Sequence, residues 1–433
     1  MEKIIINKLG PINHCELIIK DFMVFTGPQA SGKSTIAKSI FFFKNIKNLL
    51  LMQINKRIFG VIDIIKLSTK NRLIKEIRSN FLQTFGTTWC MDNDMSIEYY
   101  YTDEIYIKIY LRKDTIVPNY IWIQFSDKLT NFLGLYDEQQ FNELAHSSNN
   151  GNIRKEIENF FKDDSEIIYI PAGRSMMTLF STQLMFMYSV MTDDQKRSLD
   201  YCTQNYLERI MQLKPLFSNS LHSLIKSKIE LTDAKINKEN LRQCAELMKE
   251  ILHGEYRNVD GEERLVVSED RYVKINFASS GQQEAVWILN VVFYYLLNNK
   301  KSYFIIEEPE SHLFPNAQKL ITEFISLAKN GGNKILLTTH SPYILGTINN
   351  LLYANKISKD VEKKELNKII DSSKWLDYKK LSSYFVEYGN IQSCLDEESE
   401  AIDNEKIDSA SDKINDDYDK MLELRYNSSM EKE

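Results

Sequence analysis

Four short segments of this sequence combine residue types that handle phosphate groups. The first fits the phosphate-loop pattern G-x-x-x-x-G-K-[ST] and reads Gly27, Pro28, Gln29, Ala30, Ser31, Gly32, Lys33, Ser34, Thr35. Glycines let main-chain N–H groups close around phosphate oxygens, and the helix that follows directs its positive end at the anion. We expect Lys33 to reach the β and γ phosphates of ATP and Ser34 to ligate Mg²⁺. The alternative is a Gly-rich surface turn, but here an apolar strand precedes the loop and a helix follows it.

The second segment ends an apolar strand with adjacent carboxylates, Glu307 and Glu308, followed by Pro309-Glu310. In a parallel sheet these acids would lie at the carboxyl edge, beside the phosphate loop. Consecutive side chains on a strand point in opposite directions, so the two acids need different tasks. We expect Glu307 to hold the Mg²⁺ shell and Glu308 to polarise the attacking water. Read without the phosphate loop, the segment would be a solvated loop.

The third segment is an apolar strand that ends at Thr339-His340-Ser341-Pro342. A lone histidine is usually structural. His340, however, follows the acid pair by one strand-helix-strand unit, which would bring it to the same edge of the sheet. We expect it to contact the γ-phosphate and to sense its loss.

The fourth segment contains Ser279, Ser280, Gly281 and Gln282, between a predicted hairpin and a helix. Serine and glycine at a helix N-terminus form a second anion site. One triphosphate needs only one phosphate loop, so this second site would serve the γ-phosphate held by another copy of the chain. The alternative is a plain helix cap, for which serine is well suited.

The elements that would position these segments alternate between strand and helix, which predicts an α/β fold. We expect a mixed, mainly parallel sheet with an antiparallel β-subdomain and a helical insertion. Strands are predicted at 3–9, 15–19, 23–25, 120–125 and 166–170, with hairpins at 96–112 and 263–277. The predicted divisions are an N-terminal ATPase lobe at 1–175, a helical insertion at 176–255, a C-terminal ATPase lobe at 256–395 and an acidic helical tail at 396–433.

The composition is that of a globular protein, with 43% hydrophobic and 26% charged residues and a net charge of −6. The tail from Asp396 holds 14 acidic and 5 basic residues, so the rest of the chain is slightly basic. In the tail, Ile414, Tyr418, Met421 and Leu422 share one helical face, which would either pack on the body or bind a partner. The five cysteines are scattered, and no apolar run could span a membrane, so we expect a cytoplasmic protein.

The order of the four segments resembles that of the ABC-type ATPase superfamily, in particular its RecF, SMC and OLD branch. Two segments are similar to OLD-like ATPases of bacterial anti-phage systems such as Septu, PARIS and retrons: 307–315, which reads Glu-Glu-Pro-Glu-Ser-His-Leu-Phe-Pro, and 170–175, which reads Ile-Pro-Ala-Gly-Arg-Ser. The resemblance implies a head-to-tail pair of ATP sites, each joining one copy's phosphate loop to the other's 279–282. Glu307 stands where most members have Asp, and Ser280 replaces a glycine. Arg174 would contact nucleotide or form a structural salt bridge.

Three functions remain open at this stage. The first is an ATP-dependent switch or sensor in an anti-phage complex, forming a homodimer or higher homo-oligomer and controlling a separate nuclease or toxin. The second is a DNA-repair or chromosome-maintenance ATPase that binds nucleic acid directly, using a basic stretch of Lys66, Lys70, Arg72, Lys75 and Arg78. The third is a transporter subunit, which the helical insertion and the acid motif fit poorly. The 93 residues after His340 are too few for the nuclease domain of OLD proteins.

Overall fold

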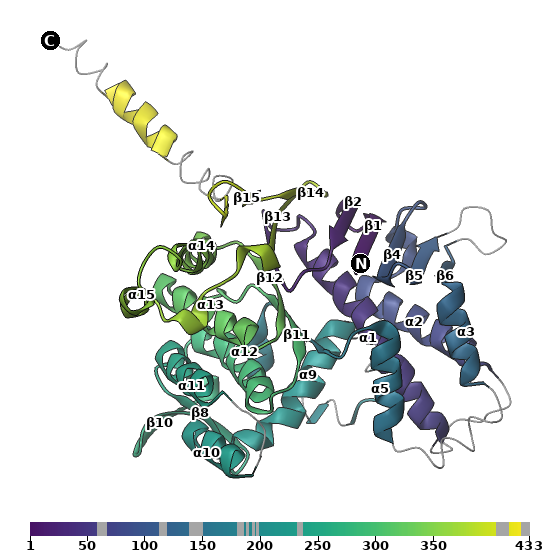
Figure 1. Cartoon of the computed structure of the whole chain (residues 1–433), viewed down its shortest axis with the longest axis horizontal. Coiled ribbons are helices and arrows are strands. Elements are labelled where there is room, and N and C mark those ends of the chain that lie inside the picture. The colour runs from purple at the N-terminus through teal and green to yellow at the C-terminus, as the bar shows by residue number, and fades with distance from the viewer. Residues whose placement is uncertain are drawn as a thin grey trace.

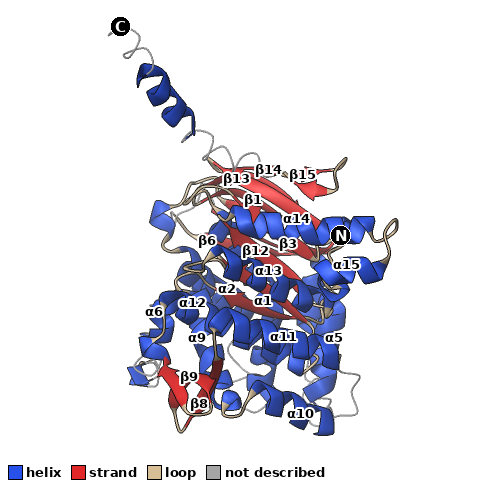
Figure 2. Cartoon of the chain, turned by 90° about the vertical axis from the view of Figure 1, so that its left-hand side faces the viewer, coloured by secondary structure: helices blue, strands red, loops and turns tan. Residues whose placement is uncertain are grey.

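The fold was analysed in a computed structural model, which describes residues 1–58, 67–111, 119–137, 150–179, 186–187, 190–192, 195, 199–231, 237–403 and 415–425. It is an α/β fold with mixed sheets, which confirms the predicted fold class (Figures 1 and 2). A mainly parallel sheet forms the centre of the body, and helices cover both of its faces. No helix in the described ranges is long and apolar enough to cross a membrane.

The central sheet has six strands and carries the predicted chemistry at one edge. Its spatial order is β14 (Asn390–Ser393), β13 (Leu381–Glu387), β3 (Phe22–Thr26), β12 (Lys334–Thr339), β11 (Ser302–Glu307) and β7 (Glu166–Ile170). All neighbouring pairs are parallel except β13–β14. The carboxyl ends of β3, β11 and β12 therefore meet at one edge, as the sequence predicted for the phosphate loop, the acid pair and His340.

A second sheet is antiparallel and has five strands: β2 (Ile12–Ile18), β1 (Lys3–Leu9), β4 (Ser96–Thr102), β5 (Ile105–Leu111) and β6 (Ile121–Phe125). In β4 and β5 every second residue is buried, because one face of the sheet packs on the core. This alternation is what identified the hairpin in the sequence, and the prediction is confirmed. Smaller sheets are formed by β8 (Glu255–Val259), β9 (Glu262–Ser268) and β10 (Arg271–Lys274), and by β15 (Leu395–Asp396) with β16 (Ala401–Ile402).

Helices pack on the sheets from both sides. In chain order they are α1 (Lys33–Ile58), α2 (Thr69–Phe85), α3 (Asp127–Leu135), α5 (Asn150–Phe161), α6 (Arg174–Leu179), α9 (Tyr201–Leu213), α10 (Leu221–Leu231), α11 (Lys238–Leu252), α12 (Ser280–Leu297), α13 (Pro315–Asn330), α14 (Pro342–Ile357) and α15 (Lys363–Ile369). One hydrophobic core lies between the two large sheets around α1, and the other lies under α12, α13 and α14 on the opposite face of the central sheet.

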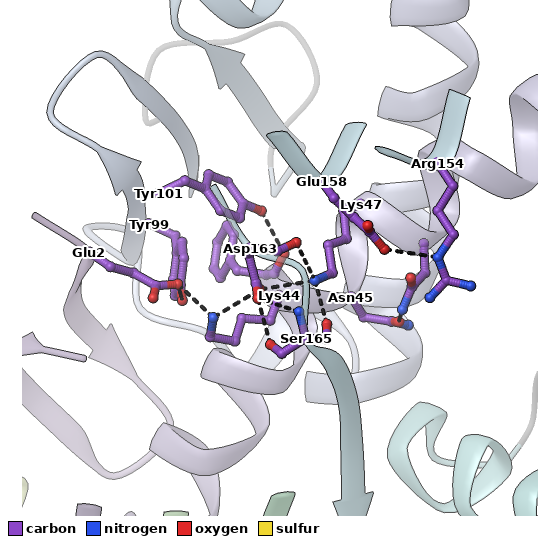
Figure 3. A network of polar contacts seen from close by, with 12 residues as sticks. Glu2, Lys44, Asn45, Lys47, Tyr99, Tyr101, Arg154, Glu158, Asp163 and Ser165 are labelled. Carbon is purple, nitrogen blue, oxygen red and sulfur yellow. Dashed lines mark hydrogen bonds and ion pairs between the residues drawn. The ribbon is translucent and has the colours of Figure 1, made fainter. Parts of the chain in front are cut away.

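Helix α1 is buried along most of its length, and its buried residues include Lys44 and Lys47. Lys44 is 1% exposed and pairs with Glu2 at 2.7 Å and with Asp163 at 3.1 Å (Figure 3). Lys47 also lies 3.1 Å from Asp163 and donates to the carbonyl of Ser165. A buried charge is tolerated only when it is paired in this way. The network thus holds the helix that follows the phosphate loop against both β1 and the start of β7.

Two peripheral regions were only partly foreseen. Helices α9, α10 and α11 lie within the predicted insertion 176–255, whereas α6 begins two residues before it. Much of 180–198 is outside the described residues, and strand β8 was not predicted. In the tail, 415–425 is helical and projects away from the body (Figures 1 and 2). Tyr418 and Met421 are each 60% exposed, and Ile414 lies outside the described residues. The described residues of the apolar face of this helix are therefore exposed.

Candidate nucleotide site

The phosphate loop connects β3 to α1 and is held tightly by its neighbours. Gly27 has a φ of +137°, and a Cβ placed there would lie 2.2 Å from the carbonyl oxygen of Val386 on β13. A residue other than glycine at this position would be strained and would clash with the sheet. Ala30 also has a positive φ, of 57°. The main-chain conformation of the loop is therefore restricted by its neighbours, and the loop leads directly into the N-terminus of α1.

Lys33 lies inside the loop with its charge turned toward main-chain oxygens. Its Nζ donates to the carbonyl of Gly27 at 2.8 Å and of Pro28 at 2.7 Å, and the residue is 5% exposed. Burial lowers the pKa of Lys33 to about 8, and the acids at 307, 308 and 310 oppose that shift. The acid pair and the loop are thus close enough to act on one ligand.

A hollow of about 260 Å³ opens above the loop. Its lining consists of Pro11, Gln29, Ala30, Ser31, Gly32, Lys33, Ser34, Thr35, Glu308 and His340. Residues from three of the four predicted segments therefore line one space. Pro11, from the turn between β1 and β2, was not among the predicted site residues, although its Gly10-Pro11 turn signal was visible.

The two adjacent acids point to different places, as expected. Glu307 is the last residue of β11 and is 5% exposed; its Oε2 accepts a hydrogen bond from the main-chain N–H of Ala172 at 3.3 Å. Glu308 has a left-handed φ of 42°, and its side chain is 37% exposed at the hollow. The left-handed turn, rather than simple strand alternation, separates the two carboxylates.

Glu308 and His340 face each other across the hollow. His340 Nε2 lies 3.4 Å from Glu308 Oε1, and Ser311 Oγ donates to Glu308 Oε2 at 3.3 Å. The hydrogen bond from His340 is the largest of the effects that lower the pKa of Glu308. Glu308 therefore stays ionised at neutral pH, as a group that orients an attacking water must.

Glu310 is a residue that the sequence reasoning left without a role. The residue is half-buried, and its carboxylate oxygen Oε1 accepts hydrogen bonds from Thr339 Oγ1 and from the main-chain N–H of His340, each at 2.7 Å. Burial raises the pKa of this carboxyl group. Glu310 thus fixes the end of β12 and with it the position of His340. In the sequence, the feature that could have indicated a role for Glu310 was its position as the third acid of Glu-Glu-Pro-Glu.

The donor set fits a magnesium ion bound together with phosphates. Ser34 is exposed to the hollow, and Oε1 of Glu307 is buried without a hydrogen-bond partner in the described part of the chain. Mg²⁺ prefers few protein oxygens and takes its other ligands from phosphates and water. The described residues contain no group of three or more His, Cys, Asp or Glu that could hold a metal ion.

The fourth segment does not line the hollow of its own chain. Ser279 is the N-cap of α12, and a complete capping box joins it to Gln282, whose Nε2 also donates to the carbonyl of Leu252 at 2.7 Å. Ser279 and Ser280 are exposed, while Gly281 is buried. The helix-cap alternative is thus present in the structure, and the contact of 279–282 with a neighbour's phosphate remains a prediction.

Arg174 is held in a buried salt bridge. It is 0% exposed and pairs with Glu284 at 3.2 Å. The salt bridge, one of the two roles left open by the sequence, is therefore present; Arg174 does not line the hollow, and a nucleotide contact stays a prediction. The sequence could not decide this because Glu284 lies 110 residues away.

The comparison with family models agrees with this site. Residues 1–345 match the model described as AAA ATPase domain. The chain belongs to this ATPase family. The match includes all four predicted segments, and membership carries nucleotide binding with it. A comparison with curated proteins gives no match.

Several solved structures are similar to this AAA ATPase domain protein over most of their length. An SmcHead bound to the C-winged helix domain of ScpA has 12% identity and a TM-score of 0.40, covering 90% of this chain and 96% of that one. The Smc head with an extended coiled coil from Pyrococcus furiosus has 12% identity and a TM-score of 0.39, covering 95% and 98%. The SMC head domain from Thermotoga maritima has 10% identity and a TM-score of 0.35, covering 90% and 97%.

The basic stretch considered for nucleic acid mostly contacts its own chain. Lys70 donates to Thr130 Oγ1 at 3.4 Å, and Arg78 donates to the carbonyl of Ile121 and lies over the ring of Tyr120. Lys75 is exposed, and Lys66 lies outside the described residues. These contacts place Lys70 and Arg78 on a helix face that packs on α3 and β6, and contact of the stretch with nucleic acid stays a prediction.

Proposed function

We propose that this chain is an ATP-dependent switch in which ATP joins two copies and hydrolysis separates them. The observation that carries the proposal is the hollow where Lys33 and Ser34 face Glu308 and His340. It supplies a cation and helix N–H groups for phosphates on one side and an ionised carboxylate on the other. The family supports the nucleotide, and the outward position of 279–282 supports the second copy.

In this mechanism each residue has a separate task. Lys33 and the loop hold the β and γ phosphates, and Ser34 with Glu307 would hold Mg²⁺, whose charge stabilises the phosphates when it is bound. Glu308 orients a water for attack on the γ-phosphorus, and His340 contacts the transferred group. The turn 279–282 of the second copy would contact the γ-phosphate from the opposite side.

We further propose that the switch belongs to an anti-phage system and controls a separate nuclease or toxin. The motif sequences at 170–175 and 307–315 support this, through their resemblance to OLD-like ATPases. The region after His340 is also used by the ATPase itself: β13 pairs with β3, and β14 extends the same sheet. The residues from 342 to 403 therefore complete the nucleotide-binding body and do not build a nuclease domain.

The test measures the mass of the full chain by light scattering with ATP and Mg²⁺, with ADP, and without nucleotide. We expect a doubling of mass, or a larger closed assembly, with ATP only. A chain that binds ATP but keeps the same mass in all three conditions would exclude the switch. Copurification with the product of an adjacent nuclease or toxin gene tests the effector, while a salt-dependent gel shift on plain duplex DNA would favour the repair alternative.

A further inference from the structure

One buried ion pair joins the acid pair to the turn that faces outward. Arg174 begins α6, just after β7, and Glu284 lies in the second turn of α12. The residues are 0% and 1% exposed, and Arg174 Nη2 lies 3.2 Å from Glu284 Oε2. The same carboxylate accepts hydrogen bonds from the main-chain N–H groups of Arg174 at 3.0 Å and Ser175 at 2.9 Å. Both carboxylate oxygens of Glu284 therefore bind groups of the same chain.

The other N–H groups of the Arg174 guanidinium donate hydrogen bonds to main-chain carbonyls. Nη1 donates to the carbonyls of Pro171 at 2.5 Å and Glu307 at 2.6 Å. Nη2 donates to the carbonyl of Glu308 at 2.9 Å, and Nε donates to that of Glu284 at 3.0 Å. The Arg174 side chain thus binds the main chain of both Glu307 and Glu308, at the left-handed turn that directs the Glu308 side chain into the hollow. Lysine could not make this planar set of bonds.

The start of α12 is tied to the same place by a second contact. Gly281 packs on the loop that follows the acid pair, so closely that a Cβ there would lie 2.6 Å from the carbonyl oxygen of His312. Thr178 of α6 also donates to the carbonyl of Gln283 at 3.0 Å. The acid pair, α6 and the turn 279–282 therefore form one rigid unit, since none of these parts can shift without breaking buried polar contacts.

We infer that Arg174 and Glu284 are positioning residues that couple the two nucleotide sites of a dimer. The inference rests on the proposed function. Within one copy, the pair links Glu308, which acts on that copy's own ATP, to 279–282, which contacts the ATP held by the second copy. Docking of the second copy's nucleotide on 279–282 is thereby transmitted to the carboxylate that orients water.

The test uses the full chain with Glu284→Gln, which keeps the shape and one of the two acceptor oxygens but removes the charge and the other acceptor. The matched control is Glu263→Gln. Glu263 is 5% exposed, pairs with Lys214 at 2.6 Å and accepts from Tyr256 at 2.7 Å, and it lies in β9, away from the hollow. Both variants lose one buried carboxylate charge, so a purely structural role predicts equal effects. Thermal midpoint, ATP affinity, kcat, KM and ATP-driven association are measured for each.

For Glu284→Gln we expect ATP affinity and KM within about twofold of the wild type. We expect kcat to fall by about 100-fold, because a small displacement of a catalytic group has that effect. ATP-driven association should need at least about tenfold more protein. Arg174→Lys should show the same split of kcat from KM. Glu263→Gln should lower only the thermal midpoint.

Three outcomes would overturn the inference. The first is a folded Glu284→Gln variant with wild-type kcat and association. The second is a loss of kcat and association that Glu263→Gln reproduces. The third is that Glu284→Gln and Arg174→Lys both fail to fold while Glu263→Gln folds, which would make the pair a folding element only. Failure of the wild-type chain itself to associate with ATP would instead refute the proposed function.

Discussion

The phosphate loop and the turn 279–282 both contain serine and glycine at a helix N-terminus, yet they differ in exposure and in the residues that surround them. The loop lies against a hollow, and its Lys33 is 5% exposed; burial lowers the pKa of Lys33, and the charges of three nearby carboxylates oppose that shift. The turn is exposed at Ser279 and Ser280, and its side chains satisfy one another through a capping box. The two sites share a local sequence chemistry but differ in what lies opposite them.

Under the proposed function, the loop is a phosphate site made by a single chain, which we call the complete site, and the turn is half of a site that needs a second chain. A phosphate in the hollow meets a lysine, a serine and helix N–H groups from a single chain. A phosphate at Ser280 would meet no cation from the same segment, so its binding energy there would be small unless another chain supplied the rest. Substitutions that disrupt only one of the two sites distinguish their contributions to ATP binding and to association.

The largest effect is expected for Glu308→Gln, which should leave both sites able to bind while it stops turnover. Loss of the ionised carboxylate should lower kcat by about 1,000-fold, within the range for a positioned base. Association with ATP should become long-lived, since the closed pair no longer hydrolyses its nucleotide. Phosphate release and light scattering measure the two quantities. Wild-type turnover in this variant would remove Glu308 from its assigned role.

Lys33→Ala breaks the complete site. The ammonium group is the only cation that lines the hollow in the described part of the chain, so its loss should weaken ATP binding by at least about 100-fold. Isothermal titration calorimetry measures this directly. Lys56→Ala is the control, because Lys56 is an exposed lysine near the other end of the same helix. Equal ATP affinity of the two variants would show that the nucleotide binds elsewhere.

The complete site was also the part that could be predicted from sequence. Its chemistry is local: the loop, the Glu307-Glu308 pair and the strand before His340 are each continuous segments, and the α/β pattern brings their ends to one edge. What escaped prediction depends on distant contacts. The role of Arg174 depends on Glu284, and that of Glu310 on Thr339 and His340. A single sequence contains no record of which distant residues meet in this way.

Ser280→Arg breaks the other half. Ser280 is exposed, so the variant chain should fold as the wild type does. The larger arginine side chain would, however, obstruct the approach of a second copy. We expect ATP-driven association to weaken by at least about tenfold while the ATP affinity of the single chain stays unchanged. The control is Ser227→Arg on α10, also exposed and far from the hollow in sequence. Loss of ATP affinity in Ser280→Arg would mean that the turn belongs to its own chain's site.

The smallest effect concerns the turn that braces the complete site, at Tyr388-Gly389 between β13 and β14. The carbonyls of Tyr388 and Gly389 accept hydrogen bonds from Asn13 at 3.0 Å each, next to Pro11 of the hollow. Tyr388 has a left-handed φ of 48° and is 84% exposed, at a turn position where asparagine is far better tolerated.

Tyr388→Asn should therefore raise the free energy of unfolding by about 1 kcal/mol, because it relieves the backbone strain of the turn without removing a buried contact. Denaturant titration measures the change. Tyr388→Phe serves as the control, since phenylalanine is strained at the same φ and should leave stability as it is. Because the acceptors for Asn13 are main-chain carbonyls, the brace survives both changes, and ATP affinity should stay constant. A variant that gained stability but lost ATP affinity would show that the tyrosine ring itself is part of the nucleotide site.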